Sequence, residues 1–457
     1  MGTAVEGLRD VAVPGPTGAA ALRAWRSMLT DPLAGFAGLR REYGPAVRVP
    51  YAPGRAAYLL SGAEHAEHVL VARQANYRKA FTYRPLRMVL GDGLLTSEGE
   101  TWAAHRRIVQ PVFAKRHLDP FVPAIADTVA TRLEAWSCDA PIDAAAEMRR
   151  MTLDIVGRAL FGADLAAEAD ELGHALATLQ AGNLLGAGVA LVPGRLGDAL
   201  LRNTRRIPRF GAQIRRLDRL VDTMVASRRA TAPEGDANLL DLLLAHSAGP
   251  EGEGLSDGEL HDEVLTLVLA GHETTAAALS WTLAELSRHP GARERVEAEA
   301  DAVLGSAAPI TAADVDRLEW THAVLQESMR LHPPAWTIER EALGDDVVGG
   351  APVPAGSTVA VPPYLLHRDP EVWPDPERFH PSRFIGVHER PRCAYLPFGA
   401  GRRICVGSAF AMMEATLALA MIAREHRLDL VGDFPHGRAE VTLRPAGAMP
   451  MRVARRR

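Results

Sequence analysis

The chain has 457 residues and a mass of 49.2 kDa, and its 47% hydrophobic and 23% charged residues exclude a disordered protein, which would lack the apolar side chains that offset ordering entropy. The 51 Lys and Arg against 56 Asp and Glu give a net charge of −5, without the basic excess typical of nucleic-acid-binding proteins. Three cysteines cannot form a disulfide framework, and no membrane span or signal peptide is visible, so we expect a soluble, cytoplasmic protein.

Short strands and one dominant helical region are predicted along the chain. Strand-like runs at 46–49 and 56–60 follow a Pro- and Gly-rich beginning. From about 100 to 335, apolar residues recur at intervals of three and four, which predicts helices. Proline and strand signals return at 347–366, and a last helix is expected at 408–425.

These elements predict one mainly α domain over 1–457 with a small β-rich lobe. We expect the β-rich lobe to combine residues of about 40–70 with residues of about 340–400. The helical lobe is expected from about 100–335 and 405–425. Because both ends of the chain supply the β-rich lobe, no linker between two independent domains is predicted.

One helix is specified unusually well. Ser256 and Glu259 form a capping box, and Pro290 ends the helical pattern after His289, so the helix exceeds thirty residues. Its middle carries few charges and is expected to be buried. The segment 270–275, Ala-Gly-His-Glu-Thr-Thr, nevertheless places a glycine, an acid and two hydroxyls there. Such a conflict between local sequence and burial often marks a functional site.

A cysteine stands in the glycine-rich segment 398–407, next to an arginine pair and before the last helix. Glycines allow a tight turn and the close approach of a bulky group, and the cations and the helix N-terminus favour a thiolate. A single thiolate in such a loop suits an axial haem ligand, which would be Cys405. The alternative is a buried, inert cysteine, and we expect this of Cys138 and Cys393.

This segment resembles the haem-binding signature of cytochrome P450 enzymes. The five fixed positions and the alanine that usually follows are filled by Phe398, Gly401, Arg403, Cys405, Gly407 and Ala411. Four further motifs of the family occur in the expected order, Trp102 with Arg106, segment 270–275, Glu327 with Arg330, and the Pro-Glu-Arg-Phe stretch 376–379. The resemblance covers essentially the whole chain. It implies a mainly α fold with a small β-rich lobe, with heme b between the long helix and the cysteine loop.

The resemblance also implies how the haem is held. The expected contacts are Cys405 as the axial iron ligand, with Trp102, Arg106, Arg340, Arg403, Phe398 and Gly399 around the ring. Trp102 and Arg106 share one helix face and could both donate to a propionate, although an ordinary half-exposed face would look the same. Arg340 is flanked by Glu339 and Glu341, which could pair with it instead.

A structural role is expected for three charged residues. Glu327 and Arg330 lie one helical turn apart, and with Arg378 they resemble the buried Glu-Arg-Arg triad of the family. There the triad holds the region of the cysteine loop in place. Removing one member of a buried pair costs about 3–5 kcal/mol, so we interpret these residues as structural rather than catalytic.

The family implies reductive activation of O2 at a thiolate-ligated haem and oxidation of an unreactive C–H bond. Glu273 fits the relay of protons, and the Thr274 hydroxyl fits the holding of the bound oxygen. Gly271 would leave space for O2 and loosen the helix locally. The alternative is that Thr274 bonds to the helix carbonyl of Ala270, and both interpretations can hold together.

Electrons are expected from separate chains, a ferredoxin and a ferredoxin reductase, because no flavin- or nicotinamide-binding segment is apparent. Ferredoxins are acidic, so the docking surface should be basic. Its candidates are Arg107, Lys115, Arg116, His117 and Arg402. The alternative is that these are merely solvated charges.

The substrate pocket is predicted to be apolar. Its candidate residues are Phe81, Tyr83, Leu94, Leu95, Leu184, Leu185, Val189, Leu191, Val268, Leu269, Ala270, Trp336, Ile338, Ala448 and Met449. An apolar wall suits a terpenoid, fatty-acyl or polyketide substrate. The segment 331–336 looks most like bacterial members acting on terpenes or lipids, as in secondary metabolism.

Two rival functions remain beside the monooxygenase. A haem-thiolate peroxygenase or isomerase would need no electron partner, and a haem sensor or carrier would not be catalytic. The Glu273 and Thr274 pair favours the O2-dependent monooxygenase, because that reaction requires proton delivery. Nothing in the sequence resembles a DNA-binding or signalling module.

Overall fold

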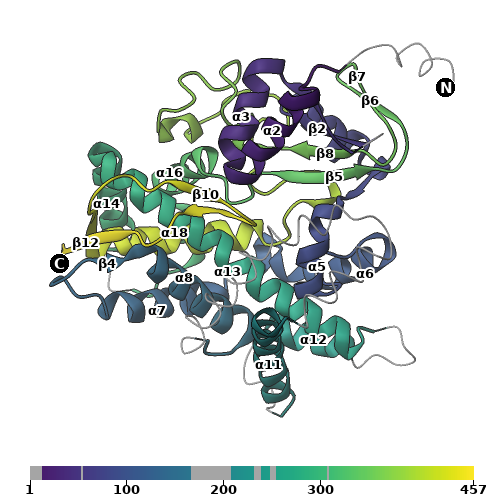
Figure 1. Ribbon diagram of the computed structural model, residues 1–457. Coiled ribbons are helices and arrows are strands. Elements are labelled where there is room, and N and C mark those ends of the chain that lie inside the picture. The colour runs from purple at the N-terminus through teal and green to yellow at the C-terminus, as the bar shows by residue number, and fades with distance from the viewer. Residues whose placement is uncertain are drawn as a thin grey trace.

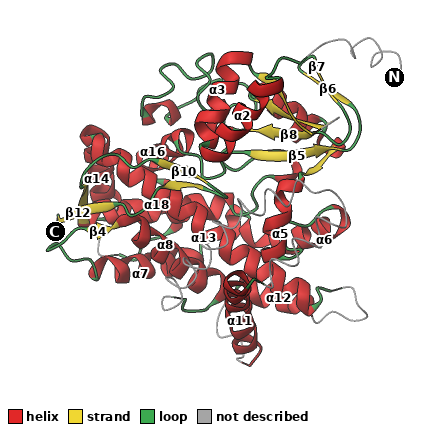
Figure 2. Cartoon of the chain, viewed as in Figure 1, coloured by secondary structure: helices red, strands yellow, loops and turns green. Residues whose placement is uncertain are grey.

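The computed structural model describes residues 13–52, 55–165, 207–230, 238–247, 254–305 and 308–456. Helices form most of this part of the chain; the largest group of strands lies at the top of the view, and β4 (Ile142–Asp143), β10 (Gly437–Ala439) and β12 (Pro450–Arg455) lie apart from it (Figures 1 and 2). The predicted mainly α fold with a β-rich lobe is therefore confirmed. Within these residues no helix combines the length and the apolar character needed to cross a membrane.

Longer helices fill the middle of the chain, and strands lie toward both ends. The described α-helices are α2 (Gly18–Thr30), α3 (Pro32–Tyr43), α4 (Ala63–Glu67), α5 (Arg84–Leu90), α6 (Gly99–Val109), α7 (Phe121–Glu134), α8 (Ala144–Val156), α11 (Pro208–Ala230), α12 (Leu239–Ser247), α13 (Asp257–Arg288), α14 (Pro290–Leu304), α15 (Ala312–Asp316), α16 (Glu319–Leu331), α17 (Pro363–Leu366) and α18 (Ser408–Glu425). The described strands are β1 (Ala46–Ala52), β2 (Arg55–Leu60), β3 (Tyr77–Lys79), β4 (Ile142–Asp143), β5 (Ile338–Ala342), β6 (Asp346–Val348), β7 (Ala351–Val353), β8 (Thr358–Val361), β9 (His426–Leu430), β10 (Gly437–Ala439), β11 (Leu443–Pro445) and β12 (Pro450–Arg455).

The largest sheet has five strands in the order β1-β2-β8-β5-β3. The two strand runs predicted near residues 46 and 56 form its first hairpin, β1 with β2. Strand β8 pairs with β2 in parallel, with Leu59 opposite Ala360. Strand β5 pairs with β3, which sets Arg340 opposite Lys79. The sheet therefore joins segments that are far apart in the sequence and brings two cations side by side.

Helix α13 crosses the centre of the molecule (Figure 1). It has 32 residues and is thus roughly 48 Å long. The predicted capping box is present, since the Ser256 hydroxyl accepts from the Glu259 N–H and the Glu259 carboxylate accepts from the Ser256 N–H. The helix ends at Arg288, two residues before Pro290. The predicted start and end are confirmed.

Gly271 of α13 lies against α8. A Cβ at this position would come within 3.2 Å of the Val156 side chain, so the glycine lets the two helices approach closely. Helix α13 stays α-helical on both sides of Gly271. The expected local loosening is therefore wrong, and the close helix packing explains the glycine.

Helix α18 begins three residues after Cys405 and has the predicted bounds. Its buried face consists largely of small and branched apolar residues, and it packs against α7, α13, α14 and α16. A helix buried on so many sides fixes the position of the segment before it. The cysteine loop is therefore anchored at its C-terminal end.

Glu327 and Arg330 of α16 form a fully buried, bidentate ion pair. The Arg330 Nε donates to Glu327 Oε2 at 2.7 Å, and its Nη2 donates to Glu327 Oε1 at 2.9 Å. The other guanidinium N–H groups donate to the backbone carbonyls of His367, Pro376 and Arg378. One side chain thus fastens α16 to the coil that leads to the cysteine loop.

The third member of the triad is Arg383, which corrects the prediction of Arg378. Arg378 has an exposed side chain and offers only its carbonyl oxygen. The Arg383 Nε lies 3.3 Å from Glu327 Oε1, and its Nη2 donates to the Asp375 carbonyl. The sequence Pro-x-Arg-Phe occurs twice, at 376–379 and at 381–384, and only the second arginine points to the buried carboxylate.

We predict that the three arginines differ in their effect on stability. Arg330→Ala should lower the free energy of unfolding by about 3–5 kcal/mol, because it leaves a buried carboxylate without its main partner. Arg383→Ala should cost about 1–3 kcal/mol, since Arg330 still pairs with Glu327. Arg378→Ala should stay within about 0.5 kcal/mol. Soluble yield and urea unfolding midpoints check this order, and an Arg378→Ala cost equal to that of Arg383→Ala would contradict it.

Candidate active site

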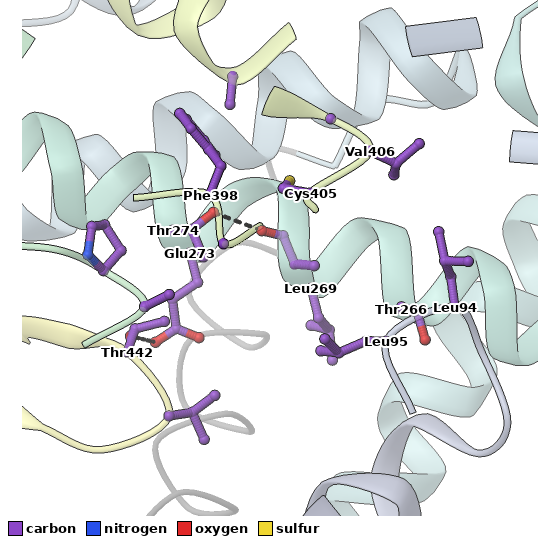
Figure 3. Close-up of a pocket in the computed structure, with 18 of the residues that line it drawn as sticks. Leu94, Leu95, Thr266, Leu269, Glu273, Thr274, Phe398, Cys405, Val406 and Thr442 are labelled. Atoms are coloured by element: carbon purple, nitrogen blue, oxygen red, sulfur yellow. Dashed lines mark hydrogen bonds between the residues drawn. The ribbon is translucent and has the colours of Figure 1, made fainter. Parts of the chain in front are cut away.

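A cavity of about 460 Å³ lies between α13 and the segment 397–407 (Figure 3). Most of its wall is apolar, with four cations and a few acid and hydroxyl groups. The lining residues include Lys79, Tyr83, Met88, Val89, Leu94, Leu95, Trp102, Arg106, Leu269, Ala270, Glu273, Thr274, Ile338, Arg340, Phe398, Gly399, Arg403, Cys405, Phe410 and Thr442. The size is ordinary for a small-molecule site.

The cysteine loop turns tightly below α13. Gly399 and Gly401 have φ values of 72° and 69°, which side chains other than glycine rarely adopt. A Cβ on Gly401 would lie 1.9 Å from the Leu70 carbonyl oxygen, so this position also needs glycine for space. The Cys405 N–H donates to the Phe398 carbonyl at 2.9 Å and closes the loop. The cysteine side chain consequently lies in the cavity wall (Figure 3).

The Cys405 side chain is exposed to the cavity. Enclosure by the surrounding protein raises the pKa of the Cys405 thiol, whereas the Gly407 N–H and the Arg106 cation lower it. The Arg106 cation and the N–H at the start of α18 thus act in the predicted direction, and the thiolate stays a prediction. A coordinated metal deprotonates a thiol outright, so metal binding can supply what the surroundings do not.

The other two cysteines are not in the cavity wall. Cys393 is buried, as expected, and burial raises the pKa of its thiol. Cys138 is exposed, which corrects the expectation that it is buried. It lies in the loop after α7.

Arg403 and Trp102 meet at one end of the cavity. The guanidinium lies 4.2 Å from the centre of the Trp102 ring, and its Nη2 is 2.6 Å from Glu98 Oε2. Nη2 also donates to the Ser97 carbonyl at 2.8 Å. Burial lowers the pKa of Arg403 to about 10. Its Nη1 is buried and has no hydrogen-bond partner among the described residues.

Arg340 and Arg106 also reach this end of the cavity. The side chains of β5 alternate, so Arg340 is buried whereas the Glu339 and Glu341 positions are less so. Of the two expected competitors, Glu341 pairs with Arg78, and Glu339 accepts from the Arg340 Nη1 through its backbone carbonyl at 2.9 Å. Arg106 donates to the Ile404 carbonyl at 2.8 Å and thereby ties α6 to the cysteine loop.

Lys79 is a fourth cation here, and sequence reasoning missed it. Strand β3 alternates buried Tyr77, exposed Arg78 and half-buried Lys79, so the side chain of Lys79 faces the cavity. Burial and the nearby Arg340 and Arg403 lower its pKa well below the usual value. The only sequence feature that could have indicated Lys79 was the alternation of inward and outward residues along β3. A strand of three residues is too short for such an alternation to be recognised. An anionic ligand group at this end would pair with the three arginines and would favour the charged form of Lys79.

Glu273 and Thr274 lie on the face of α13 that lines the cavity (Figure 3). The Thr274 hydroxyl donates to the Ala270 carbonyl at 2.8 Å, as the alternative interpretation predicted. The Glu273 carboxylate accepts from the Thr442 hydroxyl at 3.4 Å. An acid and a hydroxyl therefore stand next to each other in an otherwise apolar part of the wall.

Several predicted pocket residues do line the cavity. They are Tyr83, Leu94, Leu95, Leu269, Ala270 and Ile338. Leu184, Leu185, Val189 and Leu191 lie outside the described residues.

Phe81, Val268 and Trp336 do not line the cavity, which corrects their prediction. The Phe81 ring packs toward Tyr51, with ring centres 6.2 Å apart. Val268 is fully buried in the core, because neighbouring positions on a helix face different ways. Trp336 packs on Phe36 and donates its indole N–H to the Glu440 carbonyl.

The predicted C-terminal pocket residues also lie elsewhere. Met449 is buried in the core, and its N–H donates to Asp143 Oδ1, while Ala448 is exposed. Val441 and Thr442, seven residues earlier, line the cavity in their place. A short, irregular connection between β10 and β11 gave no periodicity from which this position could be predicted.

All five candidate residues for docking a redox protein are exposed. The Lys115 Nζ lies 3.0 Å from Asp316 of α15, and Arg116 donates to the His117 ring. Arg402 lies 5.7 Å from the Trp102 ring centre, close to the cationic end of the cavity. Arg107 is on the same helix, α6, as Trp102.

Comparison with known proteins decides the family. The cytochrome P450 family model matches residues 24–444. The chain belongs to the cytochrome P450 family. A Mycobacterium tuberculosis protein that carries the name cytochrome P450 132 is 38% identical over 419 residues, covering 88% of this chain and 89% of that protein.

Two relatives from Streptomyces melanosporofaciens are also similar. Cyclooctatin synthase is 37% identical over 429 residues, covering 89% of this chain and 91% of the relative. Cyclooctat-9-en-7-ol 5-monooxygenase is 35% identical over 390 residues, covering 84% and 83%. Cytochrome P450 enzymes are iron-dependent haem-thiolate oxidoreductases, so this chain is an enzyme of that type.

The residues of the cavity fit a haem. The Cys405 sulfur stands in the wall, and the facing stretch of α13 carries the small residues Ala270 and Gly271. The orphaned Nη1 of Arg403, together with Lys79 and Arg340, provides donors for carboxylates at one end. Donor chemistry and space therefore agree with a flat, dianionic group that binds a thiolate.

We predict that Cys405→His abolishes the thiolate-type absorption of the reduced, CO-bound protein, because an imidazole donates less charge to iron. The absorption spectrum of the CO complex measures this. Cys138→Ser and Cys393→Ser are matched controls and should keep the spectrum, since neither side chain lines the cavity. A thiolate-type spectrum in Cys405→His would refute the assignment.

Proposed function

We propose that this cytochrome P450 is a monooxygenase that oxidises a terpenoid with O2 and electrons from a separate redox protein. The observation that carries the proposal is the composition of the cavity wall. Cys405 lies on one side, Glu273 and Thr274 lie on the other, and the remaining wall away from the four basic side chains is mostly apolar, with a few hydroxyl groups. The names of the two Streptomyces relatives, which refer to cyclooctatin chemistry, support a terpenoid over a fatty-acyl or polyketide substrate.

Cys405 would be the axial ligand of heme b, and the four cations would hold its propionates. When bound, the haem supplies the reductive activation of O2. Arg403 has an unused N–H, and Trp102 packs against its guanidinium, so these two side chains would orient one carboxylate. Arg340 and Lys79 lie opposite each other across two strands and suit the other. Arg106 would keep the loop in register through its bond to the Ile404 carbonyl.

Glu273 and Thr274 would control protons at the distal side. The Thr274 hydroxyl donates its hydrogen bond to the Ala270 carbonyl. Its oxygen can therefore still accept a hydrogen bond from a group in the cavity. Glu273 can exchange a proton through its carboxylate, and the Thr442 hydroxyl holds that carboxylate from the opposite wall. The apolar side chains around them keep bulk water away from the reacting atoms.

A ferredoxin with its reductase is the proposed source of electrons. The exposed cations Arg107, Arg116 and Arg402 lie on or near the elements that carry Trp102 and the cysteine loop. An acidic partner would be attracted to this face, and such attraction weakens as salt rises. Lys115 contributes less than its charge suggests, because Asp316 lies 3.0 Å from its ammonium.

We predict that Thr274→Ala separates oxygen consumption from product formation. The variant should keep haem and substrate binding, yet release hydrogen peroxide in place of oxidised terpenoid. Each tenfold loss of the coupled rate corresponds to about 1.4 kcal/mol of transition-state stabilisation. The ratio of product formed to reduced cofactor consumed is the measurement.

Thr275→Ala is the matched control for this variant. Its hydroxyl makes the same kind of bond, to the Gly271 carbonyl at 3.0 Å, one position further along the helix. The control should keep the wild-type ratio. A ratio in Thr274→Ala equal to that of the wild type would remove Thr274 from the proposed role.

We predict that the purified chain turns over no substrate with a nicotinamide cofactor alone, and that added ferredoxin and reductase restore activity. Turnover without any protein partner would instead favour a peroxygenase or isomerase.

We also predict that Lys115→Glu with Arg116→Glu raises the ferredoxin concentration needed for half-maximal rate severalfold, and most at low salt. Arg23→Glu with Arg41→Glu makes the same change of charge on α2 and α3 and should leave that concentration unaltered.

A further inference from the structure

One wall of the cavity is a loop that rests directly on the first turns of α13. The loop spans residues 91–97, between α5 and α6, and supplies Leu94 and Leu95 to the wall (Figure 3). A Cβ on Gly91 would lie 2.0 Å from Asp262 Oδ2, and a Cβ on Gly93 would lie 2.1 Å from the Thr266 hydroxyl. At these two glycines the backbone of the loop therefore packs directly against the Asp262 and Thr266 side chains of the helix.

Two successive carboxylates of α13 receive the backbone of this loop. Asp262 Oδ2 accepts from the Asp92 N–H at 2.7 Å, and Glu263 Oε2 accepts from the Leu94 N–H at 2.7 Å. Asp262 is partly exposed, whereas Glu263 is fully buried. Leu94 is itself a residue of the cavity wall. Glu263 therefore holds the backbone at the position that carries a wall side chain.

The second oxygen of Glu263 faces a buried histidine of α6. His105 is 2% exposed, and its Nδ1 lies 3.3 Å from Glu263 Oε1. Its Nε2 lies 3.7 Å from Glu259 Oε1, also on α13. Burial opposes a charge on His105, but the two glutamates outweigh it, and the pKa of His105 is raised. Glu263 thus connects α13 with both the loop and α6.

A buried charge is a costly way to fasten a loop. An apolar residue of similar size often stabilises a core at least as well as a buried ion pair, whereas a carboxylate with directed hydrogen bonds fixes one arrangement. Here the arrangement concerns the residues that touch the substrate. Helix α6 also carries Trp102 and Arg106 at the cationic end of the cavity. The contact between Glu263 and His105 therefore links the loop to the helix that would help to hold the haem.

We propose that Glu263, with His105 as its buried partner, is a positioning residue that fixes Leu94 and Leu95 and thereby sets which carbon of the substrate is oxidised. The proposal rests on the proposed monooxygenase function for its effect on products. Glu263 does not line the cavity and touches neither substrate nor haem. It acts through the Leu94 amide, and a looser loop lets a flexible terpenoid bind in more than one register.

The first measurement is amide hydrogen exchange in the haem-loaded protein, which needs no turnover. In Glu263→Leu the Leu94 amide should exchange at least about tenfold faster, because its acceptor is gone. Glu263→Gln keeps an acceptor oxygen and should stay within about threefold of wild type. The Asp92 amide, held by Asp262, serves as an internal reference and should change little in either variant. An unaltered Leu94 rate in Glu263→Leu overturns the proposal.

The second measurement is the distribution of products from farnesol, a flexible terpene alcohol, with ferredoxin and reductase present. Glu263→Leu should spread oxidation over more positions, with the major product falling at least about twofold in share, and Glu263→Gln should restore the wild-type pattern. Glu259→Gln is the control, since it contacts His105 but not the loop. Equal spreading in Glu263→Gln and Glu263→Leu would refute the positioning role.

Two further outcomes keep the two proposals separate. If wild type oxidises neither farnesol nor other terpenoids while the Leu94 amide behaves as described, the proposed function fails and the positioning of the loop stands. If Glu263→Leu does not fold, His105→Phe leaves Glu263 in place without its partner, and its Leu94 amide should exchange severalfold faster. An unchanged rate in His105→Phe overturns the proposal.

Discussion

The position of the cysteine loop depends on one buried guanidinium. Arg330 uses all its N–H groups, two on Glu327 and three on backbone carbonyls of the chain that follows α16. That chain is a long coil with little secondary structure of its own, and it would otherwise have few directed bonds to the helices. Once it is fastened, Leu396 can donate to the buried His367 ring and the glycine turns can bring Cys405 under α13. The chemistry of the cavity therefore depends on an ion pair that takes no part in it.

The cavity has two chemically different regions, and each follows from the elements that form it. Strands β3 and β5 pair in a register that sets Lys79 opposite Arg340, so the sheet delivers positive charge to one end. Helix α13 delivers an apolar face interrupted only by Glu273 and the threonines. The cationic end suits the dianionic haem of the family, and the apolar face suits the proposed hydrophobic substrate. The loop at 91–97 adds the remaining side, and two carboxylates of α13 hold its backbone.

Features carried by a local pattern could be predicted from the sequence. The capping box and the proline set the ends of α13, and α18 has the predicted bounds 408–425. The lining of the cavity by Cys405, Glu273 and Thr274 followed from motifs with fixed spacing. Features that depend on tertiary packing could not be predicted from the local sequence. Arg378 and Arg383 have the same local sequence, and Trp336 and Ile338 are two residues apart, yet only one of each pair faces the predicted site.

The pairing of β2 with β8 has a consequence for how the molecule is made. Leu59 and Ala360 are neighbours in one sheet but are separated by about 300 residues of chain. At a synthesis rate of about 5–20 residues per second, the first hairpin waits about 15–60 s for its partner strand to leave the ribosome. During that time the edge of β2 that later meets β8 has no strand to cover it, and such an edge is a site where chains associate wrongly. The bulge in the hairpin near Pro50, which interrupts the regular register of β1, lies on the strand that stays at the sheet edge. The nascent chain is thus most exposed to misassembly at β2, and a holding chaperone would have most to protect there.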